Sequence, residues 1–124
     1  MSDQRPKNLN LFTIRFPLPA IVSILHRISG VILLLCLPFL LWSLDTSLSS
    51  QEGFDSMRNS ISSPLIKMAI LLFLAPFFYH LVAGIRHLLM DLNIGVGLKG
   101  GRLTAALTFV ITLVLVMLAG IYLW

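Results

Sequence analysis

Polar and ionisable side chains occur inside two long apolar segments of this 124-residue chain, where such groups are costly and usually functional. In chain order these residues are Ser23, His26, Arg27, His80, Arg86, His87 and Asp91. At 100° per residue, His80, His87 and Asp91 fall on one face of a helix, and Ser23 and Arg27 share a face of the earlier one. The spacing therefore predicts a polar site between two helices.

A haem group is one ligand that these residues could hold. A neutral imidazole in an apolar cavity is an axial ligand of haem iron, which makes His80 a candidate. Gly84, one turn along, leaves room for a flat macrocycle against the backbone. His26, Arg27 and His87 are candidate cations for the anionic propionates. His80 and His87 cannot bind one iron, because residues seven apart on a helix are about 10 Å apart. The second ligand is then His26 or a residue of another chain.

A quinone is a second candidate ligand. It needs an apolar slot, a hydroxyl donor for one carbonyl oxygen, and a cation that stabilises the negative charge of the reduced ring. Ser23 and Arg27 lie one helical turn apart and meet these requirements. These residues alone favour a membrane redox subunit without identifying the enzyme.

Each residue also has a simpler structural interpretation. His80 could be hydrogen-bonded to a neighbouring helix, Arg86 is expected to extend to lipid headgroups, and Asp91 could merely end its helix. The single cysteine, Cys36, is expected to be a packing residue, and it excludes an intrachain disulfide. Threonines in membrane helices usually bond to their own backbone, which is the expectation for Thr104, Thr108 and Thr112.

Composition predicts that membrane-spanning helices position these residues. Apolar residues make up 57% of the chain and charged residues 11%, against about 25% charged in soluble domains. Since roughly 20 apolar residues cross a bilayer core, we predict a single all-α membrane domain with transmembrane helices at residues 18–44, 64–90 and 103–124. Pro76 is expected to kink the second helix. A serine-rich stretch at 45–63 and a flexible, glycine-containing connection at 91–102 join them.

The distribution of basic residues predicts the orientation. Most of them lie in the N-terminal segment and the second connection, as Arg5, Lys7, Arg15, Lys99 and Arg102. We therefore expect a cytoplasmic N-terminus, a periplasmic C-terminus, and Trp42, Tyr122 and Trp124 at the outer interface as an aromatic belt. The histidines then lie in the cytoplasmic half of the membrane. No cleaved signal or transit peptide is visible, which favours a multi-pass protein of a bacterial inner membrane.

Several segments resemble the cytochrome b subunit of succinate dehydrogenases, the larger of their two membrane anchors. They are Arg5-Pro6 with Asn8-Leu9, Thr13-Ile14-Arg15-Phe16-Pro17, residues 23–30, Ser47-Leu48-Ser49-Ser50 with Glu52-Gly53-Phe54, and Tyr79-His80 followed by Gly84-Ile85-Arg86-His87 and Asp91. The most specific parts are Ser-x-x-x-Arg at 23–27 and His-x3-Gly-x-Arg-His-x3-Asp at 80–91. The resemblance covers nearly the whole chain in the right order.

The resemblance implies half of a heterodimeric, haem-binding helical bundle. His80 would ligate the iron of haem b, and a second, smaller anchor subunit would supply the other ligand. Ser23 and Arg27 would line the ubiquinone site, with His26 and Arg27 near the haem propionates. An iron–sulfur subunit and a flavoprotein that oxidises succinate would complete the enzyme, so no activity is expected from this chain alone.

Other classes of function stay open on the sequence. A membrane scaffold that tethers soluble subunits without haem would lack a Soret band. A transporter or channel subunit would show flux that depends on Arg27 or Asp91 without redox activity. The anchor of a related fumarate reductase is a close variant. Nucleic acid is not an expected partner, because the basic residues form no run.

Overall fold

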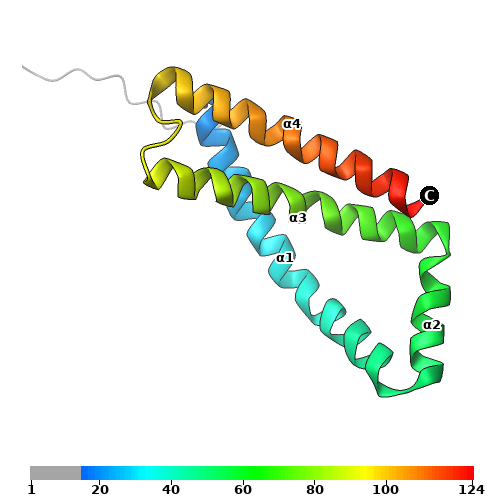
Figure 1. Ribbon diagram of the computed structural model, residues 1–124. Helices are drawn as coiled ribbons and strands as arrows, with labels where there is room; N and C mark the ends of the chain where they lie inside the picture. Colours follow the sequence, from blue (N-terminus) through cyan, green and yellow to red (C-terminus); the bar gives the residue numbers. More distant parts are fainter. Residues whose placement is uncertain (1–14) are drawn as a thin grey trace, which may run out of the picture.

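The computed structural model describes residues 15–124, which form four α-helices and no β-strand (Figure 1). α1 covers Leu18–Ser49, α2 Gln51–Ile61, α3 Pro64–Asp91 and α4 Gly97–Leu123. α1, α3 and α4 are long and apolar enough to cross a membrane, which confirms the predicted all-α membrane architecture with three spans. Arg5, Lys7 and the motifs through Ile14 lie outside the described residues.

The serine-rich stretch after the first span is helical, which the sequence analysis did not predict. α1 continues past residue 44 because serine can bond to its own helix: the Ser47 hydroxyl donates to the Ser43 carbonyl at 2.7 Å. Ser50 then caps α2, since its hydroxyl accepts the backbone N–H of Gly53 at 3.0 Å. The connection between the first two spans is thus a short helix.

The connection between α3 and α4 is a tight turn of residues 92–96 instead of the expected flexible segment. The backbone N–H of Ile94 donates to the Leu89 carbonyl at 2.9 Å and closes the end of α3. Gly95 has a φ of 69°, and a Cβ atom there would lie 2.6 Å from Thr104 Cγ2. Glycine is therefore needed both for the left-handed backbone and for the close approach of α4. Because the turn is short, α4 begins at Gly97, before the predicted residue 103.

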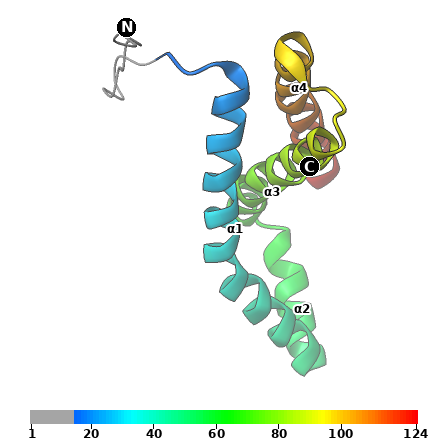
Figure 2. The ribbon, with the colours of Figure 1, turned by 90° about the vertical axis from the view of Figure 1, so that its left-hand side faces the viewer.

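The three long helices meet mainly at the end of the molecule opposite α2. α3 and α4 lie side by side and antiparallel, whereas α1 crosses α3 and then diverges from it (Figures 1 and 2). α2 joins the diverging ends, so that α1, α2 and α3 outline a triangle in Figure 1. The buried core consists of Val22, Tyr79, Ala83 and Ala105, with Leu18 and Phe109 packed against it. α3 continues as one helix through Pro76.

Two tryptophans of the predicted aromatic belt lie at the α2 end. The Lys67 ammonium, in the first turn of α3, is 5.5 Å from the centre of the Trp124 ring. Trp42 lines a hollow of about 400 Å³ between α1, α2 and α3, together with Ile61 and Ile66. Both tryptophans therefore lie at one end of the bundle, although the side of the membrane that this end faces stays a prediction.

Most large apolar side chains of the described residues are on the outside. Val22 and Thr108 are the largest side chains that are fully buried, whereas Leu34, Phe39 and Leu72 expose 67%, 73% and 74% of their surface. An apolar surface of this extent is stable against lipid or against other apolar helices. The small core means that much of the chain's surface is available for such contacts.

Arg86 of α3 forms hydrogen bonds to α4. Its side chain is only 5% exposed, and its Nε donates to Thr104 Oγ1 at 3.1 Å while Nη2 donates to the Gly101 carbonyl at 3.3 Å. The expectation that Arg86 extends to lipid headgroups is therefore wrong, because the early start of α4 places two acceptors beside it. The threonine stripe bonds to its own backbone as expected, from Thr104 to Gly100, from Thr108 to Thr104 and from Thr112 to Thr108.

We expect Thr104→Val to weaken the contact between α3 and α4. The substitution keeps the shape of the side chain but leaves Arg86 Nε without its hydroxyl acceptor, and such losses cost about 1 kcal/mol between membrane helices. Thr112→Val is the matched control, because the Thr112 hydroxyl donates to its own helix. Thermal denaturation in detergent should show a lower midpoint for Thr104→Val alone. Equal midpoints for the two variants would contradict this function of Thr104.

Candidate functional site

Three histidines form a stack between α1 and α3. The His26 ring of α1 lies between the two histidine rings of α3, with centroid distances of 4.3 Å to His80 and 4.9 Å to His87. The planes are nearly parallel, at 15° and 23° respectively. The two helices thus bring their polar groups to one level, as their positions in the sequence predict.

Tyr79 and two glycines allow α1 and α3 to approach at this level. The buried Tyr79 hydroxyl donates to the Val22 carbonyl at 2.8 Å, one turn before His26. A Cβ atom on Gly30 would lie 3.1 Å from His80 Cε1, and one on Gly84 would lie 3.4 Å from His26 Nε2. An imidazole ring therefore lies beside each glycine, and the expected room for a macrocycle beside Gly84 stays a prediction.

The hydrogen-bond partners of His80 favour a proton on one of its two ring nitrogens. His80 Nδ1 lies 3.0 Å from Ser29 Oγ and 3.2 Å from the His26 carbonyl oxygen. A carbonyl oxygen can only accept, so the second contact is a hydrogen bond only when Nδ1 is protonated. In the neutral ring, Nε2 then keeps a free lone pair, which is the form that binds a metal.

His87 has the same proton arrangement through a local bond. Its Nδ1 lies 2.7 Å from the Ala83 carbonyl oxygen, one turn earlier in α3. This contact also requires a protonated Nδ1 and leaves Nε2 with a lone pair. The hydrogen-bond partners of His80 Nδ1 belong to α1, whereas the partner of His87 Nδ1 belongs to α3 itself. The packing of α1 against α3 therefore orients the His80 ring.

The remaining predicted site residues lie around the stack without joining it. Ser23 is half-buried and Arg27 is exposed on α1, so the guanidinium faces lipid or another chain. Arg86 points to α4, as described above. Asp91 is exposed and is the last residue of α3, which agrees with its simpler role as a helix end. Cys36 is half-buried and free, as expected for a packing residue.

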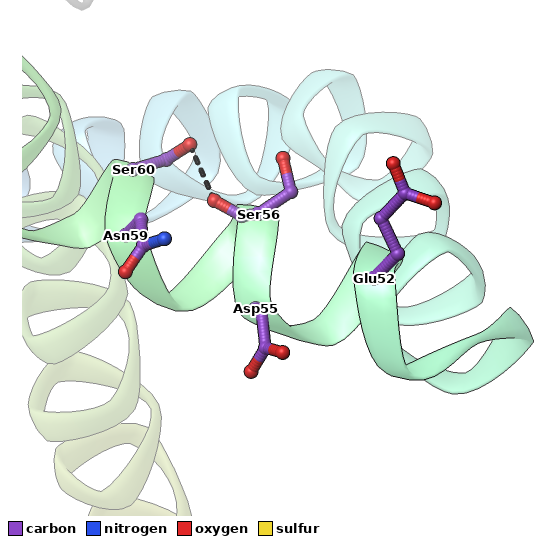
Figure 3. A pocket seen from close by; sticks show the side chains of 5 residues that line it. All are labelled: Glu52, Asp55, Ser56, Asn59 and Ser60. Carbon is purple, nitrogen blue, oxygen red and sulfur yellow. Dashed lines mark hydrogen bonds between the residues drawn. The ribbon is translucent and has the colours of Figure 1, made fainter.

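Two hollows of the described region lie away from the histidines. One of about 160 Å³ lies between α3 and α4 and is lined mainly by apolar side chains with Arg86, Thr104 and Thr108. A broad, open hollow of about 820 Å³ lies on α2 and is lined by the exposed polar residues Glu52, Asp55, Ser56, Asn59 and Ser60, whose side chains are drawn in Figure 3. This open polar surface suits water or lipid headgroups. Within residues 15–124, no group of three His, Cys, Asp or Glu side chains could hold a metal ion.

Ser29 and Tyr79 are parts of the site that were not predicted from the sequence. Ser29 lies one turn after His26, and Tyr79 directly precedes His80. These positions were the available signal, because a polar group one turn from, or next to, an intramembrane histidine is placed to bond to the opposite helix.

Comparison with known proteins gives a family for this arrangement. A family model described as "Succinate dehydrogenase/Fumarate reductase transmembrane subunit" matches residues 1–119. The "Succinate dehydrogenase cytochrome b556 subunit" of Coxiella burnetii is 39% identical over 125 residues, covering 100% of both chains. The "Succinate dehydrogenase cytochrome b560 subunit" of Reclinomonas americana is 35% identical, covering 92% of this chain and 85% of the relative. The b556 subunit of Rickettsia bellii is 33% identical, covering 82% and 79%.

Proposed function

This chain belongs to the succinate dehydrogenase/fumarate reductase transmembrane subunit family, and from this premise we propose that it anchors a succinate dehydrogenase, binds haem b and takes part in ubiquinone reduction. The observation that carries the proposal is the bonding of His80, whose Nδ1 is held by α1 while Nε2 keeps its lone pair. Bound haem would supply one-electron redox chemistry within the membrane.

The stack indicates which ligands the iron would take from this chain. To bind one iron together, His26 and His80 would each have to direct a ring nitrogen at it, whereas the two rings present their faces to each other at 4.3 Å. His26 is therefore not placed as the partner of His80. We assign His80 alone as the ligand from this chain and infer that a second small anchor subunit provides the other. His26, Arg27 and His87 are the nearby groups that can neutralise propionates.

Ser23 and Arg27 are the residues that we assign to quinone binding. They lie one turn apart on α1, with Ser23 half-buried and Arg27 exposed beside the histidine level. The Ser23 hydroxyl can donate to a quinone carbonyl, and the Arg27 guanidinium can stabilise the negative charge that develops on the oxygens. Since Arg27 faces outward, the quinone would bind between this chain and a neighbouring subunit or lipid.

The partner subunits that we propose are inferred from the cofactor-binding motifs that the sequence lacks and from the apolar surface that the helices expose. Its sequence contains one cysteine and no dinucleotide-binding motif, so the flavin and the iron–sulfur centres would belong to a flavoprotein and an iron–sulfur subunit. The exposed apolar faces of α1 and α3 suit a membrane partner. An anchor of a fumarate reductase is a variant of the same assignment. A haem-free scaffold is the alternative, favoured by the hydrogen bonds of His80 and His87 to groups of this chain, and a missing Soret band would support it.

We expect the protein to lie in a bacterial inner membrane with the turn at 92–96 in the cytoplasm and α2 outside. The basic residues Arg15, Lys99 and Arg102 all lie at the end opposite α2. A reporter that is active only in the periplasm should be active when fused after Glu52 and silent when fused after Gly97. The reverse pattern would invert the topology and place the histidines in the outer half of the membrane.

We expect His80→Leu to abolish or strongly change the reduced b-type haem spectrum of the complex, because it removes the ligand nitrogen. His87→Leu is the matched control: it removes an imidazole from the same stack, and a haem should remain. Spectra of membranes containing the complete complex give this comparison. Loss of haem from His87→Leu with retention in His80→Leu would show that the ligand assignment is wrong.

We expect Ser23→Ala and Arg27→Leu each to slow quinone reduction by roughly 10²-fold or more, because a hydrogen bond to developing charge in an apolar site contributes a few kcal/mol. Arg27→Lys should rescue only partly, since an ammonium does not reproduce the guanidinium geometry. Succinate oxidation with an artificial acceptor that takes electrons upstream should persist. Equal loss of both activities, with less complex in the membrane, would instead assign the two residues to assembly.

A further inference from the structure

The Ser29 side chain contacts two groups, one in its own helix α1 and one in α3. The side chain is 4% exposed and lies in α1 on the side that packs against α3. Its hydroxyl donates to the His26 carbonyl at 2.7 Å, a common bond for serine in a helix. The same oxygen lies 3.0 Å from Nδ1 of His80, which is 51 residues away in the chain. The second contact connects α1 to the proposed ligand.

The two contacts of Ser29 fix the direction of the second hydrogen bond. A hydroxyl carries one proton, and the Ser29 proton is given to the His26 carbonyl, so its oxygen can only accept from His80. The His26 carbonyl oxygen, 3.2 Å from the same Nδ1, is also only an acceptor. Both contacts therefore favour the tautomer of His80 that carries the proton on Nδ1.

One turn of α1 also sets the position of the His80 ring. The ring edge lies over Gly30, where a Cβ atom would be 3.1 Å from Cε1, and one ring face packs on His26. Edge, face and Nδ1 are therefore all contacted by residues 26–30. Of the two hydrogen-bond partners of Nδ1, only the Ser29 hydroxyl belongs to a side chain, so a substitution can remove it without altering the backbone.

We propose that Ser29 is a positioning residue for haem binding, whose hydroxyl accepts the Nδ1–H of His80 and so leaves the Nε2 lone pair to bind an iron. The proposal rests on the assignment of His80 as ligand. A hydrogen-bond acceptor at the ring nitrogen that does not bind the metal makes the imidazole a more basic ligand, and a more basic ligand favours the oxidised metal. Loss of such an acceptor usually lowers metal affinity by 10- to 100-fold.

The test uses the complete complex in native membranes, with Ser29→Ala compared with Ser29→Thr. Ser29→Ala should raise the midpoint potential of the b haem and speed the loss of haem to an excess of apomyoglobin by roughly 10-fold or more. Ser29→Thr keeps a hydroxyl and should stay near the wild type. Ser43→Ala is the matched control, because Ser43 also donates to a carbonyl three residues earlier in α1 but bonds to no histidine. It should change neither property.

An unchanged midpoint potential in Ser29→Ala would overturn the proposal, even if the variant were less stable. Should Ser29→Ala not accumulate, Ser29→Thr and Ser29→Val give the same comparison, because they differ only in the hydroxyl, and equal potentials in that pair would also overturn it. Haem that is absent from the wild-type complex, or that persists in His80→Leu, would instead contradict the proposed function. The two failures are therefore distinguishable.

Discussion

Hydrogen bonding between α1 and α3 at the level of the histidines is the interaction on which the rest of the structure depends. In a bilayer no water is available to satisfy polar groups, so each must bond within the protein. Tyr79 bonds to the Val22 carbonyl, and His80 bonds to Ser29 and to the His26 carbonyl. These bonds fix the register of the two helices, and the register in turn places His26 between the two α3 histidines.

The rest of the fold is arranged around this contact and leaves much apolar surface uncovered. α4 is attached to α3 through Arg86, a buried cation with two neutral acceptors. Toward α2 the helices diverge, and a hollow of about 300 Å³ opens between α1 and α3, with another of about 400 Å³ between α1, α2 and α3. At 1.5 Å per residue, the 32 residues of α1 extend about 48 Å, well beyond a hydrocarbon core of about 30 Å. A long, oblique α1 with exposed apolar faces is consistent with one part of a larger membrane assembly.

The spans and the level of the site could be predicted from the sequence, because both depend on periodicity and helical rise alone. Counting residues placed His26 near His80 and His87 without knowledge of packing. The location of Arg86 could not be predicted in this way, since its acceptors belong to α4, 15 and 18 residues further along the chain. The stacking order and the contact of Ser29 with His80 also depend on the register of α1 against α3, which hydropathy does not encode.

The predicted and observed helix ends differ because serine and glycine residues there can each adopt more than one local structure. Serine hydroxyls can cap a helix or bond within it, and here Ser47 does the second while Ser50 does the first. The sequence shows that serines are present but does not show which bond each one forms. The glycines after α3 were likewise ambiguous, because left-handed glycines occur in tight turns as well as in flexible segments.

An experimental density map of the intact complex is the most direct test of the central claim, that α1 orients His80 as a haem ligand. The account predicts iron bound to His80 Nε2, with Ser29 Oγ within hydrogen-bond distance of His80 Nδ1 and the opposite ligand from a second subunit. Iron bound to His26 or His87, or a His80 ring turned so that Nδ1 faces the iron, would contradict it.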